Sequence, residues 1–289
     1  MDQAERLRHK MMAIDKISCK TIAVVSGKGG VGKSNFSTNF SIALAQLGHK
    51  VLVVDMDIGM GNIHILLGKS ARNSLTHYLQ GECTIQEVIH QDTYGIDFIA
   101  GGSGMSSILR WSDFMFERLI FAFNELQKNY DYILFDMGAG ATEWSLQFIM
   151  AVDDIVVIST TEPTSVTDAY SMMKYIHTKD ESKQYYVVSN RAFTIVEGQD
   201  SLQRLATTMQ RFLNNTIQAL GVIPEDMQVR KAIQQQKPFK ALYPSAHASK
   251  AIDRIARIYV NGLQDEHMAQ QTHEPFLSKL RNLFSKGRA

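Results

Sequence analysis

Short apolar runs rich in β-branched residues alternate along the chain with longer segments whose apolar residues recur every three or four positions. The first pattern is typical of buried strands, and the second is typical of helices that cover a sheet. Strands and helices that alternate at these lengths indicate a parallel sheet with helices on both faces. We therefore predict a single α/β domain with a mostly parallel sheet. The runs with strand character are 21–25, 51–55, 96–100, 132–136, 155–159, 185–189 and 220–223.

Both ends of the chain depart from this alternation. Residues 1–20 combine basic side chains with apolar residues at helical spacing, so we expect an arm that folds against a partner. The alternative is an arm that packs on its own domain or has no role. Residues 264–274 are polar and are predicted to form a linker. Residues 275–289 place apolar side chains on one helical face with basic side chains beside it, which is typical of a membrane-surface helix. The alternative is a helix packed on the core of the domain, which is predicted to span 21–263. The residues predicted to contact the membrane are Phe276, Leu277, Leu280, Leu283 and Phe284.

Composition narrows the class of protein. The 289 residues are 45% hydrophobic, which is enough for a sizeable core, and the formal net charge is +1. A chain so close to neutral is attracted as a whole to neither nucleic acid nor membranes. Its two cysteines, Cys19 and Cys83, are too few for a disulfide framework. The sequence contains neither a secretory signal nor a run of about 18 apolar residues, so we expect a cytoplasmic protein.

A glycine-rich segment connects the first predicted strand to the first predicted helix. Residues 27–34 fit the pattern G-x-x-x-x-G-K-[ST], and strand, loop and helix follow in the order that a phosphate-binding loop requires. The main-chain N–H groups of the loop and the helix N-terminus would surround the phosphates. Lys33 would reach the β- and γ-phosphates, and the Ser34 hydroxyl would bind Mg²⁺. The predicted nucleotide contacts here are Gly27, Gly29, Gly30, Val31, Gly32, Lys33, Ser34 and Asn35.

Two other predicted strands end in a carboxylate. The run 132–136 ends at Asp136 and continues into a glycine turn, which is the Walker B pattern. We expect Asp136 to hold Mg²⁺ through a bound water. The run 51–55 ends at Asp55, a plausible supporting residue, and continues into a loop that contains Asp57 and two glycines. The glycines indicate a mobile switch beside the phosphates.

A second lysine, Lys28, directly follows the first glycine of the phosphate loop. The string 28–34 resembles the deviant Walker A motif of the MinD/ParA family, and the resemblance covers residues 21 to about 262. It implies an ATP-dependent homodimer in which Lys28 reaches the nucleotide of the partner subunit. It also implies that Asp57 orients the attacking water, because the family carries an aspartate at this position; loop capping is the alternative. Lys28 and Asp57 are thus the implied catalytic residues, and ATP or ADP with Mg²⁺ are the implied ligands.

The resemblance extends to the side of the site that would hold the base. The pairs Asn190-Arg191 and Pro224-Glu225 resemble the adenine-side elements of MinD-type ATPases. No guanine-reading N-K-x-D sequence is present. The resemblance therefore favours ATP over GTP.

Three further strings, 2–8, 136–140 and 161–164, resemble the flagellar-number branch of this family, the FlhG proteins. That branch is implied to control the number and placement of flagella together with the GTPase FlhF and flagellar switch-ring proteins. The tail would bind anionic lipid on the inner face of the cell membrane. Two other functions stay open: a MinD-like division-site regulator and a ParA-like DNA-segregation ATPase, although nucleic acid is not an expected partner. The arm residues expected to contact FlhF are Gln3, Arg6 and Leu7.

Overall fold

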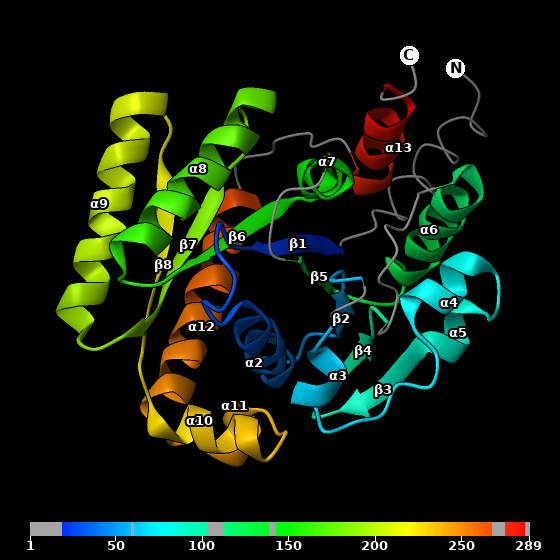
Figure 1. Cartoon of the computed structure of the whole chain (residues 1–289), viewed down its shortest axis with the longest axis horizontal. Helices are drawn as coiled ribbons and strands as arrows, with labels where there is room; N and C mark the ends of the chain where they lie inside the picture. Colours follow the sequence, from blue (N-terminus) through cyan, green and yellow to red (C-terminus); the bar gives the residue numbers. More distant parts are fainter. Residues whose placement is uncertain (1–18, 59–60, 103–111, 139–142, 268–274, 287–289) are drawn as a thin grey trace, which may run out of the picture.

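The computed structural model describes residues 19–58, 61–102, 112–138, 143–267 and 275–286. These residues form one eight-stranded sheet with helices on both sides, in the strand order β3-β4-β2-β5-β1-β6-β7-β8 (Figure 1). The strands are β1 (Lys20–Val25), β2 (Val51–Asp55), β3 (Ile89–Thr93), β4 (Ile96–Ile99), β5 (Tyr132–Asp136), β6 (Asp154–Ser159), β7 (Tyr185–Ala192) and β8 (Ile217–Pro224). The helices are α2 (Lys33–Gln46), α3 (Ile63–Leu66), α4 (Leu75–Gln80), α5 (Ile85–Val88), α6 (Asp113–Leu126), α7 (Glu143–Ala151), α8 (Pro163–Lys179), α9 (Ile195–Leu213), α10 (Met227–Gln234), α11 (Phe239–Leu242), α12 (His247–His267) and α13 (Phe276–Lys286).

Neighbouring strands run parallel except for β3, which pairs antiparallel with β4 at one edge. The register places Val24 of β1 and Asp55 of β2 on either side of Asp136 of β5. Two strand-terminal carboxylates therefore meet next to the loop that leaves β1. Ligand sites of such sheets lie at the carboxyl ends of the strands. This edge is where a functional site is expected.

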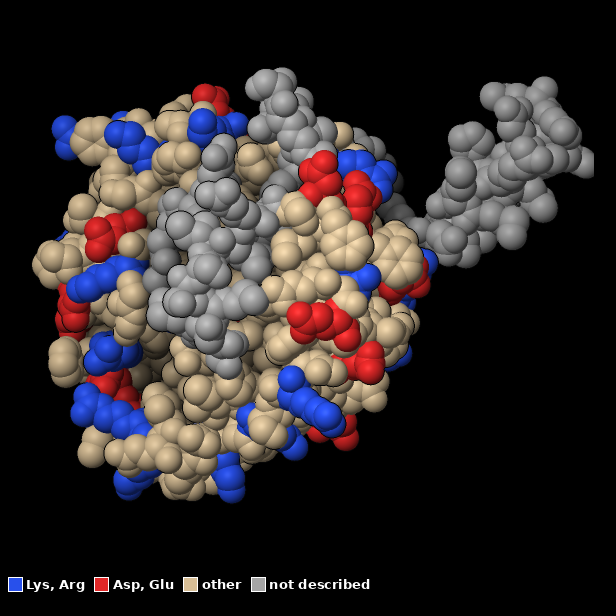
Figure 2. Space-filling model, turned by 45° about the vertical axis from the view of Figure 1, so that its right-hand side comes forward, with Lys and Arg blue, Asp and Glu red and all other residues tan. Residues whose placement is uncertain are grey.

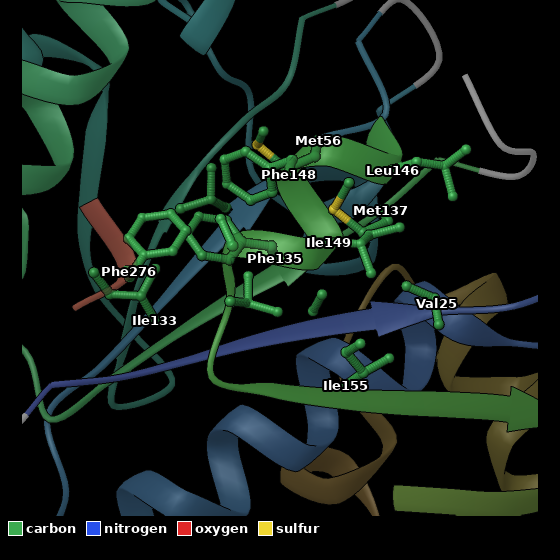
Figure 3. Close-up of a cluster of buried hydrophobic side chains, with 14 of the residues drawn as sticks. Val25, Met56, Ile133, Phe135, Met137, Leu146, Phe148, Ile149, Ile155 and Phe276 are labelled. Atoms are coloured by element: carbon green, nitrogen blue, oxygen red, sulfur yellow. The ribbon is translucent and has the colours of Figure 1, made fainter. Parts of the chain in front are cut away.

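Each face of the sheet has its own hydrophobic layer. Along β1, Ala23 and Val25 belong to one layer, and Ile22 and Val24 belong to the other, as the two-residue period of a strand requires. The first layer packs against α4, α6, α7, α8, α9 and α13 and contains the cluster in Figure 3. The second packs against α2, α11 and α12. Burial on both faces explains why the strands are continuous apolar runs rather than alternating ones.

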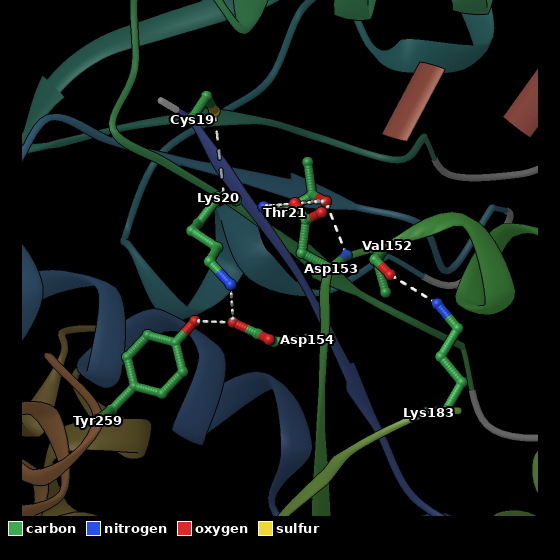
Figure 4. Close-up of polar contacts among 8 residues, drawn as sticks. All are labelled: Cys19, Lys20, Thr21, Val152, Asp153, Asp154, Lys183 and Tyr259. Carbon is green, nitrogen blue, oxygen red and sulfur yellow. Dashed lines mark hydrogen bonds and ion pairs between the residues drawn. The ribbon is translucent and has the colours of Figure 1, made fainter. Parts of the chain in front are cut away.

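The amino end of the sheet, opposite the candidate site, is closed by buried polar contacts (Figure 4). Asp154 accepts a hydrogen bond from the Tyr259 hydroxyl at 2.6 Å, and the Lys20 ammonium lies 3.4 Å away. Lys183 Nζ donates to the main-chain carbonyl of Val152 at 2.8 Å. Burial raises the pKa of Asp154 above its usual value, and the charge of Lys20 opposes that rise. These contacts join β1, β6 and α12 at this end.

The predicted fold class is confirmed, and each predicted strand is present. Two local differences have physical causes. Strand β3 was not predicted, because its pairing with β4 at the sheet edge leaves Gln91 and Asp92 exposed and His90 half-buried, which gives no apolar run. Helix α12 continues to His267, so the first residues of the predicted linker are helical. Within the described residues, no helix has the length and apolar content needed to cross a bilayer.

Candidate functional site

The loop between β1 and α2 has the geometry of a phosphate cradle. Gly30 and Gly32 have positive φ angles of 79° and 90°, which glycine adopts without strain. Gly27 packs so closely on α8 that an added Cβ would lie 2.1 Å from the carbonyl oxygen of Asp168. Gly32 is the N-cap of α2, where no side chain caps the helix and no acidic residue occupies the first turn. The first N–H groups of α2, together with its positive end, are therefore left for an anion.

Three side chains of α2 converge on Asp136. The Ser34 hydroxyl donates to Oδ2 at 2.5 Å, the Ser37 hydroxyl donates to Oδ1 at 2.8 Å, and Lys33 Nζ lies 3.4 Å from Oδ1. Asp136 and Lys33 are both buried. Hydroxyl and carboxylate oxygens are ligands that suit Mg²⁺, and the ammonium supplies positive charge beside them. The donor set fits a magnesium-bound phosphate, which Lys33, Ser34 and Asp136 would hold.

Asp57 lies beside the same aspartate. A Cβ added to Gly138, two residues after Asp136, would be 3.2 Å from Asp57 Oδ1. Partial burial raises the pKa of the Asp57 carboxyl; the charge of Lys33 opposes this rise, and the charge of Asp136 adds to it. The geometry brings Asp57 to the edge where the phosphate loop and the Asp136 turn meet.

Asp55 holds the loop that carries Asp57. Its fully buried carboxylate accepts the main-chain N–H of Asp57 at 3.1 Å and that of Ile63 at 3.2 Å. Burial raises the pKa of Asp55 to about 7, and the negative charge of Asp136 adds to the rise. One carboxylate therefore ties together the start of the loop and the start of α3.

Lys28 is paired within its own chain. Its Nζ lies 3.1 Å from Glu162 Oε2 and 3.3 Å from Thr164 Oγ1, both at the start of α8. The side chains of Lys28 and Glu162 are 43% and 62% exposed, and ion pairs between such exposed groups contribute little free energy. Lys28 is therefore available to exchange this partner for another.

A pocket of about 240 Å³ opens beside the phosphate loop. Asn190 Nδ2 donates to the carbonyl of Val31 at 2.8 Å and fastens the loop to the end of β7. Glu225 joins two arginines, with Arg191 Nε at 3.0 Å from Oε2 and Arg230 Nη2 at 2.8 Å from Oε1. Burial alone would raise the pKa of Glu225, but the hydrogen bonds from these arginines lower it. The predicted residues that line this pocket are Gly30, Gly32, Asn35, Asn190, Arg191, Pro224 and Glu225.

Several residues at the site were not predicted. Ser37 lies one turn after Ser34, a spacing that could have indicated its approach to Asp136. The contact between Lys28 and Glu162 spans 134 residues of sequence, so no local pattern could reveal it. Arg230 lies five residues after Glu225, but its role depends on how α10 follows β8.

The tail helix α13 lies against the domain. Phe276 and Leu280 are 2% and 0% exposed, and the Phe276 ring packs on Phe123, Phe135 and Phe148 at 5.6 to 5.9 Å between ring centres (Figure 3). Leu277 and Leu283 pack on the same layer at partial exposure. The predicted apolar face is therefore buried by protein in this structure. The side chain of Phe284 and the arm residues Gln3, Arg6 and Leu7 lie outside the described residues.

The phosphate loop precedes a helix, a hydroxyl and a carboxylate lie together in a pair suited to Mg²⁺, and a pocket adjoins them. These features define a P-loop nucleotide-binding protein. The comparison with known families agrees, because residues 18–259 match the family described as "ParA: NUBPL iron-transfer P-loop NTPase". The chain belongs to this ParA/MinD family of P-loop NTPases.

Two curated relatives have flagellar names. The "Antiactivator FleN" of Pseudomonas aeruginosa is 34% identical over 82% of this chain and 85% of its own length. The "Flagellum site-determining protein YlxH" of Helicobacter pylori is 32% identical over 86% of this chain and 85% of its own length. The septum site-determining protein MinD of Bacillus subtilis is 25% identical over 92% of this chain and 98% of its own length.

Solved structures of MinD have the same fold. The MinD of Pyrococcus horikoshii, solved with Mg-ADP, gives a TM-score of 0.68 at 23% identity and covers 83% of this chain and 96% of its own. The MinC:MinD complex of Aquifex aeolicus gives 0.66 at 26% identity and covers 84% and 96%.

Proposed function

We propose that this chain is an ATP-hydrolysing switch that dimerises when ATP is bound and regulates the number or placement of flagella. Its similarity to FleN and YlxH supports the flagellar process, since both names place those proteins there. Five MinD proteins are less similar, at 25% to 30% identity. The flagellar function is therefore favoured over a division-site regulator or a DNA-segregation ATPase.

In this proposal, Mg²⁺-ATP supplies the phosphoanhydride bond that is cleaved. Lys33 and the N-terminus of α2 hold the phosphates, and Ser34 and Asp136 hold the ion. Asp57 orients the attacking water. The adenine base is held by Asn190 and by the side of the pocket that Arg191, Pro224 and Glu225 form.

The observation that carries the switch is the position of Lys28. It lies in the phosphate loop, yet its ammonium is paired with Glu162 and Thr164 at the start of α8, through exposed contacts that are easily exchanged. A lysine built into the loop but held by a weak pair is suited to move to the phosphates of a second subunit. ATP binding would thus be coupled to dimer formation.

Light scattering with a nonhydrolysable ATP analogue tests this switch. We expect the mass of the wild type to double, and we expect Lys28→Ala to stay monomeric while it still binds the analogue through Lys33. Lys69→Ala, which removes another exposed lysine, is the matched control and should behave as the wild type. A Lys28→Ala protein that dimerises and hydrolyses ATP normally would overturn the proposal.

The arm supplies a second contact in this function. Residues 1–19 precede the sheet, which begins at Lys20, so the predicted arm 1–20 overlaps β1 by one residue. We propose that Gln3, Arg6 and Leu7 contact the GTPase FlhF, and that Gln3 or Arg6 completes its active site, because a residue supplied in trans can accelerate GTP hydrolysis by orders of magnitude. A peptide of residues 1–20 should then stimulate that GTPase, and a peptide with Gln3→Ala and Arg6→Ala should not. No stimulation by the peptide, with stimulation by the full chain, would place the activating element elsewhere.

The tail and the remaining partners complete the proposal. Helix α13 would leave the domain and bind anionic lipid on the inner face of the cell membrane. Flagellar switch-ring proteins are the expected downstream partners. A salt-dependent shift of DNA in a gel assay would instead favour the DNA-segregation function.

A further inference from the structure

Helix α6 presents an apolar and acidic strip to solvent. Phe114 and Phe121 are 57% and 62% exposed, and because they lie seven residues apart they share one helical face. Glu117 lies between them and is also exposed. Figure 2 brings the α4–α6 side of the molecule forward and shows acidic side chains there among uncharged and some basic ones. We call Phe114, Glu117 and Phe121 the α6 strip.

The described neighbours of α6 leave more than half of each phenylalanine side chain in the strip exposed. The opposite face of the helix packs on the sheet through Leu119 and Phe123, and α13 and α4 lie along its two flanks. The Arg118 guanidinium lies 5.5 Å from the centre of the Phe114 ring, while its N–H groups donate to the carbonyls of Tyr78 and Cys83 and it also covers the Tyr78 ring. Among the described residues no cation forms an ion pair with Glu117. The strip therefore suits a segment that is both apolar and basic.

The arm starts next to this helix. The main-chain N–H of Lys20 donates to the carbonyl of Asp131 at 2.8 Å, in the turn that follows the end of α6 at Leu126. Phe121 lies about 7.5 Å and Phe114 about 18 Å back along the helix axis from that end, at 1.5 Å per residue. The 18 residues outside the described chain would span about 27 Å even as a helix, so they reach the whole strip.

The sequence of the arm complements the strip. Leu7, Met11 and Ile14 follow helical spacing, and no acidic residue occurs between Arg6 and Ile14. The separation of seven positions between Leu7 and Ile14 matches that between Phe114 and Phe121. An arm helix that runs parallel to α6 would place Ile14 near Phe121, Leu7 near Phe114, and the basic residues beside Glu117.

We propose that the α6 strip is the docking site of the arm of the same chain. Docking covers the apolar stripe of the arm and the two phenylalanines together, so each protects the other from solvent and from other partners. A partner of the arm must then compete with the strip, which makes α6 a regulator of that partner's access. The proposal does not depend on the proposed flagellar function, because it concerns contacts within one chain.

Hydrogen exchange of residues 4–14 in the full-length protein, followed by mass spectrometry, tests the docking. We expect exchange in the wild type to be roughly tenfold slower than in a Phe114→Glu/Phe121→Glu variant. The matched control is Phe212→Glu, which changes a phenylalanine of α9 that is 64% exposed and should leave the arm protected. Leu7→Glu/Met11→Glu should remove the protection from the other side, and Glu117→Lys should weaken it more than Glu117→Asp.

Two results would overturn the proposal. Equal exchange of the arm in the wild type and in the α6 double variant would show that the strip does not hold it. Protection that disappears on dilution would show that the arm docks on a second copy of the chain instead. Unchanged exchange of the sheet strands in every variant verifies that the fold is retained.

Discussion

At the scale of single residues, Asp55 is the side chain that fixes the loop carrying Asp57. Its two carboxylate oxygens accept N–H groups from Asp57 and Ile63. Asn at this position keeps one acceptor oxygen and turns an N–H donor toward the second N–H group. We expect Asp55→Asn to lower kcat for ATP roughly tenfold or more, because Asp57 is no longer positioned, while KM changes little.

Gly61→Ala offers an independent check on the same loop. Its added Cβ would lie 2.6 Å from Asp55 Oδ2, so it should disturb Asp57 without altering any carboxylate. Steady-state kinetics of both variants, with melting temperatures beside them, measure the effect. Normal kcat in Asp55→Asn would contradict a positioning role.

The buried ammonium of Lys183 lowers the free energy of unfolding of the domain. Burial lowers its pKa to about 8, and the charge of Lys279 on α13 adds to this. The group is protonated in the unfolded chain up to about pH 10.5. The destabilisation is therefore fully present below pH 8 and is lost as the pH rises from 8 through 10.5, above which both states are neutral.

Lys183→Met should raise the melting temperature at pH 7. The shift in pKa corresponds to at most about 3 kcal/mol, and the carbonyl of Val152 loses its donor, so the net gain should be about 1–2 kcal/mol. The gain should shrink when melting is measured at pH 10. A gain that is the same at both pH values would mean that packing, not charge, causes it.

Local sequence patterns were sufficient to predict the positions of those candidate residues that follow from their neighbours in the chain. Gly32, Lys33 and Ser34 were predicted because strand, loop and helix are consecutive, and Asp136 because it ends an apolar run. The pairs Lys28–Glu162 and Arg191–Glu225 form across long stretches of sequence. Arg191 also adopts a positive φ of 57°, which is uncommon for a side-chain-bearing residue and has no signal in its neighbours.

At the scale of elements, α13 shows what an amphipathic pattern can and cannot establish. The sequence predicted the helix and its apolar face, and the structure has both. It could not say which surface that face meets, since lipid and an aromatic cluster of α6, β5 and α7 accept the same side chains. The structure shows the face buried by protein, and its use on a membrane remains a proposal.

The packing of α13 predicts which of its side chains holds the helix on the domain. Leu280 is fully buried, and truncating a buried leucine costs about 2–5 kcal/mol, which a short helix held at the surface of a domain cannot absorb. We expect Leu280→Ala to raise hydrogen exchange within α13 by at least roughly tenfold while α12 is unchanged. Asn282→Ala, on the exposed side, is the control. Slow exchange of α13 in Leu280→Ala would show that the helix is an integral part of the domain.

At the scale of the whole molecule, alternation of strands and helices was sufficient to predict the sheet class and the edge that carries the site. It was not sufficient for the strand order, because order depends on which apolar faces pack together across the chain. The register that sets Asp55 beside Asp136 follows from that order. The placement of α13 on the β5 side of the sheet likewise follows from three aromatic residues on separate elements.

The proposed dimer and the proposed membrane tail make one prediction about the whole molecule. A single helix as short as α13, with few apolar residues, binds a bilayer weakly, whereas two tails held in one dimer gain roughly 10²–10⁴ in overall affinity. Sedimentation with anionic vesicles should therefore require the ATP analogue in the wild type. Lys28→Ala has an intact tail but should stay in the supernatant, because it does not dimerise, while Lys69→Ala should sediment.

Phe276→Glu should fail to sediment even as a dimer, whereas Ser278→Glu, with the same added charge on the exposed side of α13, should still bind. Equal sedimentation of Lys28→Ala and wild type would show that dimerisation and membrane binding are not coupled.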